Sequence, residues 1–144
     1  MTTQPERWLL DTNVWVFGLR HDESIPDCAN LLERIGSFSV VIPLQVLKEL
    51  NVNLTKDEIS NFYNLISQQP EWMELSWAAA PAERVSFYQE RGCRKGDAVI
   101  AAHAEALGVR SIVSENRQFL QTVKDLPLEI VSATDALARL ARRL

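Results

Sequence analysis

The sequence predicts an α/β fold in which helices cover both faces of a short-stranded parallel sheet, a three-layer α/β/α arrangement. Short apolar runs with the length of buried strands alternate with longer segments of helical periodicity. This alternation is typical of strand-helix-strand units, whose strands are parallel and covered on both faces. Of the 144 residues, 47% are hydrophobic and 24% are charged, an ordinary composition for a globular domain. Because a chain of this length usually builds one core, we expect a single domain over residues 1–144.

The first expected strand is the apolar run at residues 8–10, and the Asp-Thr-Asn that follows it is typical of a helix start. We expect a short helix over residues 14–19. A second helix should run to Ile35, with Asp27 as its cap and Gly36 just past its end.

The β-branched residues at 38–42 predict the second strand, and Pro43 suits the first turn of the helix after it. Apolar residues should mark the inner face of that helix: Val46, Leu47 and Leu50. A further helix should begin at the cap residue Thr55. Its apolar residues have helical spacing: Ile59, Phe62, Tyr63 and Ile66.

The second half of the chain continues the alternation. Residues 72–77 suggest a strand, and a helix should follow over residues 81–91, where Gly92 ends it. Gly96 and Asp97 should open an alanine-rich helix that Gly108 ends. The remaining elements are short strands at 111–113 and 129–131, a partial helix near 119–120, and a last helix from Ser132 or Thr134 to Leu144.

Charge and cysteine content restrict the class of protein. The net charge of −4 is not that of a protein that holds nucleic acid by bulk electrostatics, although local basic groups can still steer a substrate. Cys28 and Cys93 lack the CxxC spacing of a zinc site, and two cysteines make no disulfide framework. The sequence has no secretory signal and no apolar run of ~20 residues. We therefore expect a cytoplasmic protein with no membrane contact.

Three carboxylates stand out: Asp11, Glu49 and Asp97. Each is expected where an apolar strand gives way to a turn or helix, and an α/β fold tends to bring such places together. Three converging acids repel each other, and oxygen-rich clusters of this kind bind hard divalent cations that can assist chemistry at phosphate. The pattern therefore indicates a metal site.

Four segments carry a resemblance to a known family: LLDTNV at 9–14, KEL at 48–50, KGDAVIAAHA at 95–104 and IVSENRQFL at 112–120. In this order and approximate spacing they resemble a PIN domain of the kind found in VapC-type toxins. The resemblance implies a PIN-like α/β/α fold and a metal-dependent ribonuclease that acts on RNA. It also implies a homodimer and a small antitoxin protein as partner, that is, the toxin of a type II toxin-antitoxin pair.

By position, Asp11, Glu49 and Asp97 match the first three acidic residues of the family, which hold one or two Mg²⁺ or Mn²⁺ ions. The fourth acidic position is a departure, because Asn116 stands where the family commonly has an aspartate. An amide oxygen can bind a metal but adds no charge. Glu115 is the alternative ligand, although adjacent residues after a strand tend to point in different directions.

Other polar residues near these segments are candidates for supporting roles. Thr12, Asn13 and Ser114 could fix a carboxylate or a bound water. Arg94 and Lys95 could contact substrate phosphate.

Simpler interpretations stay open for individual residues. Asp11 and Asp97 could be helix caps only, and Glu49 could lie on a solvated helix edge. Trp15 and Phe17 are expected in the core, with base stacking as the alternative, and His21 and His103 are expected to have surface or packing roles.

The motifs suggest three functions. The first is the toxin-type ribonuclease. The second is a PIN fold with weakened metal chemistry, owing to Asn116, that binds RNA or protein without cutting. The third is a phosphatase of the haloacid-dehalogenase type, which normally needs a second aspartate where this chain has Asn13.

Overall fold

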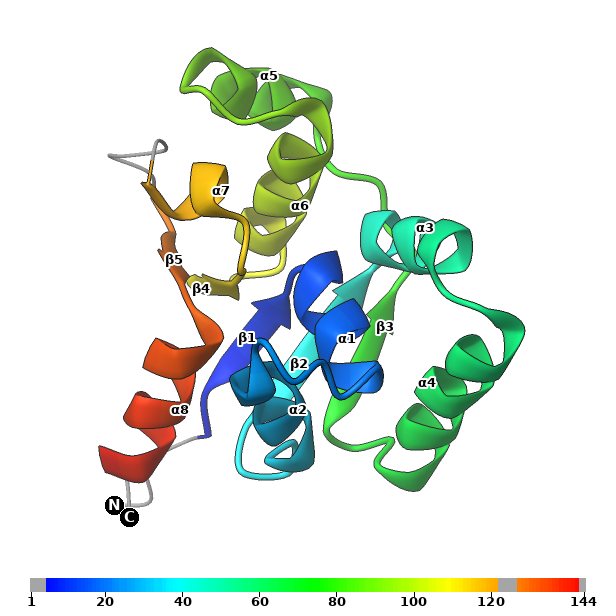
Figure 1. The fold of residues 1–144 in the computed structure, drawn as a ribbon. Helices are drawn as coiled ribbons and strands as arrows, with labels where there is room; N and C mark the ends of the chain where they lie inside the picture. Colours follow the sequence, from blue (N-terminus) through cyan, green and yellow to red (C-terminus); the bar gives the residue numbers. More distant parts are fainter. Residues whose placement is uncertain (1–4, 122–126, 143–144) are drawn as a thin grey trace.

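A five-stranded parallel sheet lies at the centre of the structure, a computed structural model that describes residues 5–121 and 127–142 (Figure 1). The strand order is β3-β2-β1-β4-β5, and every neighbouring pair is parallel. The strands are β1 (Arg7–Leu10), β2 (Ser39–Pro43), β3 (Met73–Ser76), β4 (Ser111–Val113) and β5 (Glu129–Val131).

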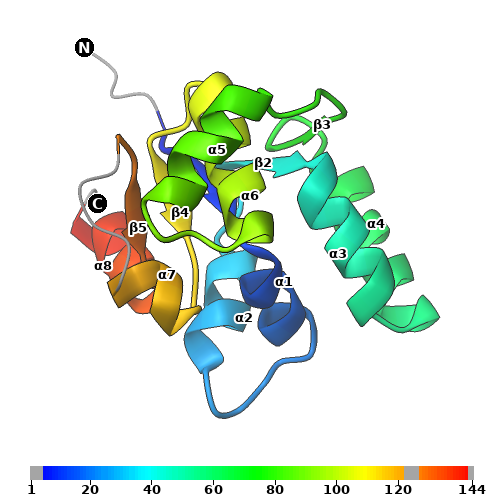
Figure 2. The same ribbon diagram turned by 90° about the horizontal axis from the view of Figure 1, so that it is seen from above.

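Helices lie on both sides of this sheet, which confirms the predicted three-layer α/β/α fold. The helices are α1 (Thr12–Leu19), α2 (Pro26–Glu33), α3 (Leu44–Asn53), α4 (Lys56–Gln68), α5 (Ala82–Glu90), α6 (Lys95–Ala106), α7 (Arg117–Gln121) and α8 (Ala133–Arg142). Figure 2 shows α1 and α2 on one side of the sheet and α5 with α6 on the other. The α8 helix packs against α2, while α3 and α4 lie together on the side where β3 forms the sheet edge (Figures 1 and 2).

The middle of the sheet, around the central strand β1, is apolar. Leu9 pairs in register with Val41 of β2 and with Ile112 of β4, and all three side chains are fully buried. Because helices cover both faces at the centre of the sheet, β1, β2 and β4 are nearly continuous hydrophobic runs, whereas the edge strands β3 and β5 carry the exposed Glu74 and Glu129.

Close packing of α1 on α2 depends on a glycine. A Cβ atom on Gly18 would lie 2.5 Å from Cδ1 of Leu32 and 3.0 Å from the carbonyl oxygen of Cys28. A side chain at this position would therefore push the two helices apart.

Several helix starts differ from the prediction. The α2 helix begins at Pro26, so Asp27 lies in its first turn instead of capping it. Proline suits the first helical position because its missing N–H would have no partner there. Pro43 is the last residue of β2 and the cap position of α3, not part of its first turn.

Other predicted boundaries are confirmed or shifted by a residue or two. Thr55 caps α4 in a reciprocal capping box with Glu58. The α6 helix begins at Lys95, so Gly96 and Asp97 lie in its first turn. The last helix is described as far as Arg142, and its predicted end at Leu144 lies outside the described residues. None of the helices in the described ranges has the length and apolar character needed to cross a bilayer.

Candidate active site

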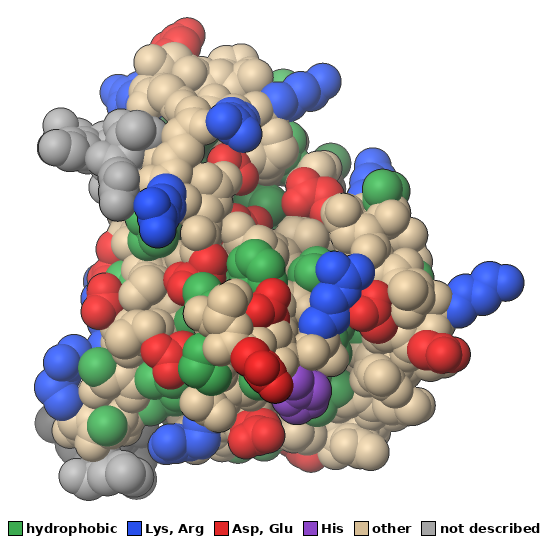
Figure 3. Space-filling model, in the orientation of Figure 1, with side chains coloured by type: hydrophobic (Ala, Val, Ile, Leu, Met, Phe, Trp, Pro, Cys, Tyr) green, Lys and Arg blue, Asp and Glu red, His purple; other side chains and the backbone are tan. Residues whose placement is uncertain are grey.

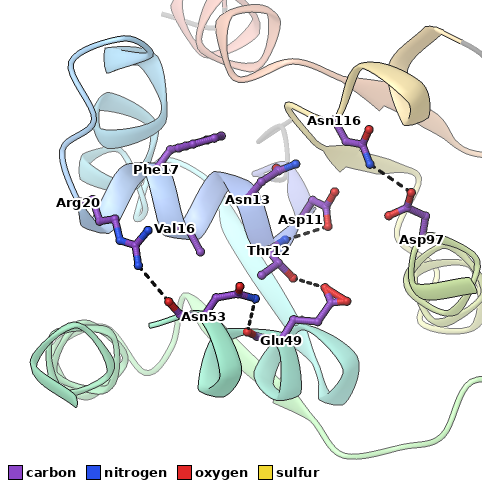
Figure 4. Close-up of a pocket in the computed structure, with 10 residues that line it drawn as sticks. All are labelled: Asp11, Thr12, Asn13, Val16, Phe17, Arg20, Glu49, Asn53, Asp97 and Asn116. Atoms are coloured by element: carbon purple, nitrogen blue, oxygen red, sulfur yellow. Dashed lines mark hydrogen bonds between the residues drawn. The ribbon is translucent and has the colours of Figure 1, made fainter. Parts of the chain in front are cut away.

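The carboxyl ends of β1 and β4 meet at the point where the strand order reverses. Neighbouring strands there are followed by connections that leave in different directions, which opens a crevice that ligands commonly occupy in parallel α/β sheets. A cavity of about 320 Å³ lies at this place. The residues lining it are Asp11, Thr12, Asn13, Val16, Phe17, Arg20, Glu49, Asn53, Asp97 and Asn116 (Figure 4).

Asp11 follows β1 directly and is buried. Its backbone N–H donates to the carbonyl oxygen of Val113, so the residue is fixed to the end of β4. One carboxylate oxygen accepts from the N–H of Thr12 at 2.8 Å, and the other accepts from the hydroxyl of Ser114 at 2.7 Å. Burial raises the pKa of Asp11, and the negative charge of Glu49 adds to this rise. Asp11 thus caps α1, as its simpler interpretation proposed, and it also faces the cavity.

Glu49 reaches the cavity from the middle of α3, well past the end of β2, so the expectation that it stands where a strand gives way to a turn or helix is wrong. One carboxylate oxygen accepts from the Thr12 hydroxyl at 2.6 Å and the other from the Gln45 amide at 3.0 Å. The backbone of Gly96 also lies against this carboxylate, because a Cβ there would be 3.2 Å from Oε2 of Glu49. These contacts fix the carboxylate in one orientation.

Asp97 reaches the cavity from the first turn of α6, which follows α5 and not a strand. Burial, reinforced by the charges of Asp11 and Glu49, raises the pKa of Asp97 to about 6. Nearby Arg94 opposes this rise. The three carboxylates therefore act on one another electrostatically although they come from three different elements.

The charges of this cluster are not balanced by ion pairs. Within residues 5–121 and 127–142, no Lys or Arg forms an ion pair with any of the three carboxylates. Nor do any three His, Cys, Asp or Glu side chains in these ranges form a group that could hold a metal ion by itself. The donor chemistry nevertheless fits a hard divalent cation, since three carboxylates face one cavity and repel each other without one.

The two candidates for the fourth acidic position point to different places. Asn116 lines the cavity, and its amide nitrogen donates to Oδ2 of Asp97 at 3.3 Å (Figure 4). Its amide oxygen accepts from the backbone N–H of Gln118 at 3.0 Å. Glu115 instead accepts from the backbone N–H of Ala133 at the start of α8, at 3.3 Å, and does not line the cavity. The structure therefore brings Asn116, and not Glu115, to the three acids.

The residues expected to support the site make specific contacts. Thr12 holds Glu49 and Ser114 holds Asp11, as described above. Ser114 is fully buried, and its hydroxyl oxygen also accepts from the N–H of Asn116 at 3.1 Å. The side-chain oxygen of Asn13 accepts from the N–H of Glu115 at 3.2 Å, which ties α1 to the loop after β4.

The basic residues expected at phosphate lie outside the cavity. Arg94 occupies the cap position of α6, and both it and Lys95 are exposed. On the face shown in Figure 3, acidic side chains gather around the hollow between α1, α3 and α6, with hydrophobic and basic side chains beside them. Arg20 is a basic residue of the cavity lining itself. The cavity is thus an acidic site with basic groups around it.

Sequence reasoning missed three residues of the cavity: Val16, Arg20 and Asn53. A signal was available for α1, because its cavity-lining residues recur with the i, i+3, i+4, i+7 spacing of one helix face. Trp15 lies in the core against Phe62, as expected, whereas Phe17 is half-buried and lines the cavity. His103 has a packing role, buried with its ring nitrogen 3.0 Å from the Ser76 hydroxyl.

A parallel α/β sheet with a carboxylate cluster at its switch point defines a class of protein suited to divalent cations and phosphate. Within that class, residues 8–125 match the model of the PIN domain, and the chain belongs to the PIN domain family. PIN domains are generally nucleases that use divalent metal ions. The resemblance predicted from the sequence motifs is therefore confirmed.

Two solved structures have a similar fold. PAE2754 from Pyrobaculum aerophilum is 17% identical, with a TM-score of 0.58, over 95% of this chain and 96% of that one. VapBC2 from Rickettsia felis, bound to a DNA fragment from their promoter, is 22% identical, with a TM-score of 0.56, over 88% of this chain and 98% of that one. A comparison with curated proteins gives no match.

Proposed function

We propose that this PIN domain is a metal-dependent endoribonuclease that hydrolyses phosphodiester bonds in RNA. The proposal rests on one observation: Asp11, Glu49 and Asp97 face a common cavity at the sheet switch point without a paired cation among the described residues. A binding site for an RNA backbone alone would present positive charge to the phosphates. An acidic cavity instead suits a divalent cation that then meets the phosphate.

We assign Asp11, Glu49 and Asp97 as ligands of Mg²⁺ or Mn²⁺ and as the catalytic residues. When bound, the ion lowers the pKa of a bound water and neutralises charge on the phosphate. The protein orients the ligands: the Ser114 hydroxyl fixes Asp11, and the Thr12 hydroxyl fixes Glu49. Asn116 donates to Asp97 and so restrains the third ligand without adding charge. A second ion would therefore bind more weakly than the first.

Arg94 and Lys95 complete the proposed site from outside the cavity. Both are exposed at the start of α6, close in sequence to Asp97. An RNA backbone that enters the cavity would pass them. Their positive charges would contact phosphates that flank the cleaved one and attract RNA to an otherwise acidic protein.

The test is cleavage of total cellular RNA by the purified protein with Mg²⁺ or Mn²⁺. We expect discrete fragments that disappear with EDTA and in the variants Asp11→Asn and Asp97→Asn. The matched control is Asp57→Asn, a change to an exposed aspartate that does not line the cavity. Intact RNA under every metal condition, from a folded protein, would contradict the proposal.

We further propose that the chain, one domain over residues 1–144, is the toxin of a type II pair in the cytoplasm. A small antitoxin protein would be its inhibitor, and the chain would form a homodimer. The family and the VapBC2 neighbour support this assignment. Cys28 and Cys93 are both buried and unbridged, as expected of a protein from a reducing compartment. Growth arrest on expression, relieved by co-expression of a small protein encoded beside it, tests the pairing, and light scattering tests the dimer.

Asn116 supports a second candidate, a PIN domain with weakened metal chemistry that binds RNA or protein without cutting. The residue replaces a charge with a neutral amide and directs its nitrogen, not its oxygen, at Asp97. An RNA gel shift that persists without any cleavage would favour this function over the nuclease.

A further inference from the structure

One face of α1 is exposed to the cavity instead of the core. The face consists of Asn13, Val16, Phe17 and Arg20, at the i, i+3, i+4, i+7 spacing of a single helix stripe. The opposite face packs in the core through Val14, Trp15 and Gly18. Figure 4 shows that Phe17 and Asn13 project from the same side of α1, while Val16 and Arg20 project toward Asn53. The cavity-facing side of α1 is therefore mixed: two half-buried apolar side chains, Val16 and Phe17, lie between two polar ones.

The apolar part of this face adjoins the carboxylates. Val16 and Phe17 are half-buried and line the same cavity as Asp11, Glu49 and Asp97. An aromatic ring and a branched aliphatic side chain contribute neither metal ligands nor acid-base groups for phosphate hydrolysis. They are suited to bind a nucleobase, which stacks on an aromatic side chain and buries its faces against apolar groups.

Among the described residues that line the far end of the cavity, no positive charge is free to attract a second phosphate. The Arg20 guanidinium donates twice to Glu58, at 2.8 and 3.2 Å, and once to the carbonyl oxygen of Asn53, at 2.9 Å. Its charge is therefore matched by that of Glu58. A neutral base and sugar suit this end better than a phosphate.

Two amides at the rim retain hydrogen-bonding capacity. The side-chain nitrogen of Asn53 donates to the carbonyl oxygen of Glu49 at 2.7 Å, and its side-chain oxygen has no partner in the part of the chain that the structure describes. The oxygen of Asn13 is taken by the N–H of Glu115, and its nitrogen is likewise unpaired among the described residues. One acceptor and one donor thus flank the apolar surface, as recognition of a base edge requires.

We infer that Val16 and Phe17, flanked by Asn13 and Asn53, form a subsite for the nucleobase and ribose next to the cleaved phosphate. This subsite rests on the proposed ribonuclease function and specifies how the substrate lies in the cavity. The phosphate meets the carboxylate end, and the base stacks on Phe17 at the apolar end.

Mononucleotides test the subsite without any cleavage, because they contain no phosphodiester bond. Affinities of uridine 5′-monophosphate, adenosine 5′-monophosphate and ribose 5-phosphate are measured by NMR titration with Mg²⁺. Since base stacking on an aromatic ring contributes ~10-fold in affinity, at least one mononucleotide should bind roughly 10-fold more tightly than ribose 5-phosphate.

Variants assign this preference to α1. In Phe17→Ala the preference for the mononucleotide should disappear while the affinity for ribose 5-phosphate is retained, and Phe17→Trp should restore the preference. Tyr63→Ala is the matched control, because Tyr63 is an aromatic residue, 40% exposed, that does not line the cavity. A retained thermal transition shows that each variant is folded.

Equal affinities for ribose 5-phosphate and both mononucleotides, or no binding of any of them, would overturn the subsite. So would a mononucleotide preference that survives in Phe17→Ala. The RNA cleavage assay reports separately on the nuclease: metal-dependent cleavage without base preference would retain the proposed function and reject the subsite.

Discussion

The side-chain nitrogen of Asn116 donates to a carboxylate oxygen of Asp97 at 3.3 Å, so the loop after β4 meets the first turn of α6 across the cavity. The amide oxygen of the same residue is used by the backbone of α7. Asn116 thus restrains an acidic residue at a position where a fourth acid would repel it. This contact distinguishes the chain from a PIN domain with four carboxylates, and it should lower the affinity for a second metal ion.

Asn116→Asp should destabilise the fold of the metal-free protein and raise its affinity for a second metal ion. The change removes the donor to Asp97 and adds a fourth negative charge, which should lower the melting temperature by roughly 3 °C, the equivalent of about 1 kcal/mol. Titration calorimetry with Mn²⁺ should then show a higher stoichiometry or affinity than in the natural protein. Asn116→Ala, which removes the donor without adding charge, is the control. Identical titration curves for Asn116→Asp and the natural protein would refute this expectation.

Asp97→Asn should stabilise the metal-free protein at pH 7.5. The pKa of Asp97, raised from 3.8 to about 6, means that the folded state disfavours its charge relative to the unfolded state. The cost in stability therefore develops as the pH rises above the unfolded value of 3.8 and is fully present above the folded value of about 6. After an allowance for solvent screening, we expect a gain of about 1 kcal/mol, or roughly 3 °C in melting temperature.

The same variant should lose the rise in melting temperature that Mn²⁺ produces in the natural protein, because a ligand has been removed. Differential scanning fluorimetry with and without Mn²⁺ measures both effects. Asp57→Asn, at an exposed aspartate outside the cavity, serves as the control. A variant that melts below the natural protein without metal would show that burial and charge repulsion at Asp97 do not dominate its contribution to stability.

Thr12→Val should impair the proposed nuclease although it retains the shape of the side chain. The Thr12 hydroxyl donates to Glu49 at 2.6 Å, and hydrogen bonds to charged groups contribute ~1.5–3 kcal/mol, so kcat/KM should fall ~10- to 100-fold. Thr12→Ser retains the hydroxyl and should recover most of the activity. Weaker Mn²⁺ binding by Thr12→Val, measured by calorimetry, provides a readout apart from activity, and equal activity of the two variants would exclude a positioning role.

Glu58→Gln should remove a stabilising contribution that depends on pH. The guanidinium of Arg20 and the backbone N–H of Thr55 lower the pKa of Glu58 to about 2. A lowered pKa stabilises the folded state above the unfolded value of about 4.5, and this contribution is lost as the pH falls toward the folded value. The melting temperature of the natural protein should exceed that of Glu58→Gln at pH 7, and the gap should narrow steadily below pH 4.5. A gap that stays constant down to pH 3 would contradict the expectation.

Gly18→Ala should destabilise the packing of α1 on α2. The added methyl group would lie 2.5 Å from Leu32, and overpacking of this kind costs about 1–3 kcal/mol, more than the helix propensity gained. Urea denaturation should show a lower midpoint with an unchanged slope. Gly96→Ala makes a useful comparison, because the Cβ there meets Glu49 at 3.2 Å and should disturb the site more than the core.

Local patterns were sufficient to predict most elements and the fold class. Buried parallel strands require continuous apolar runs, so residues 8–10 and 111–113 could be recognised without knowledge of their neighbours. The helix start at Thr55 could also be predicted from the sequence, because the contacts of a capping box lie within one helical turn. Boundaries at Pro26 and Pro43 shifted because a proline fits a cap position and a first turn almost equally well.

The geometry of the site depended on contacts between residues far apart in the chain. Motifs drew attention to the acids, but only the packing of α3 and α6 around the end of β1 brings Glu49 and Asp97 to Asp11. Whether Glu115 or Asn116 faces the cavity depends on how the chain turns after β4, which adjacent positions in a sequence do not specify. The role of Phe17 also depends on the tertiary structure. Helical periodicity predicts which face of α1 it lies on, but only the arrangement of the neighbouring elements makes that face the wall of a cavity.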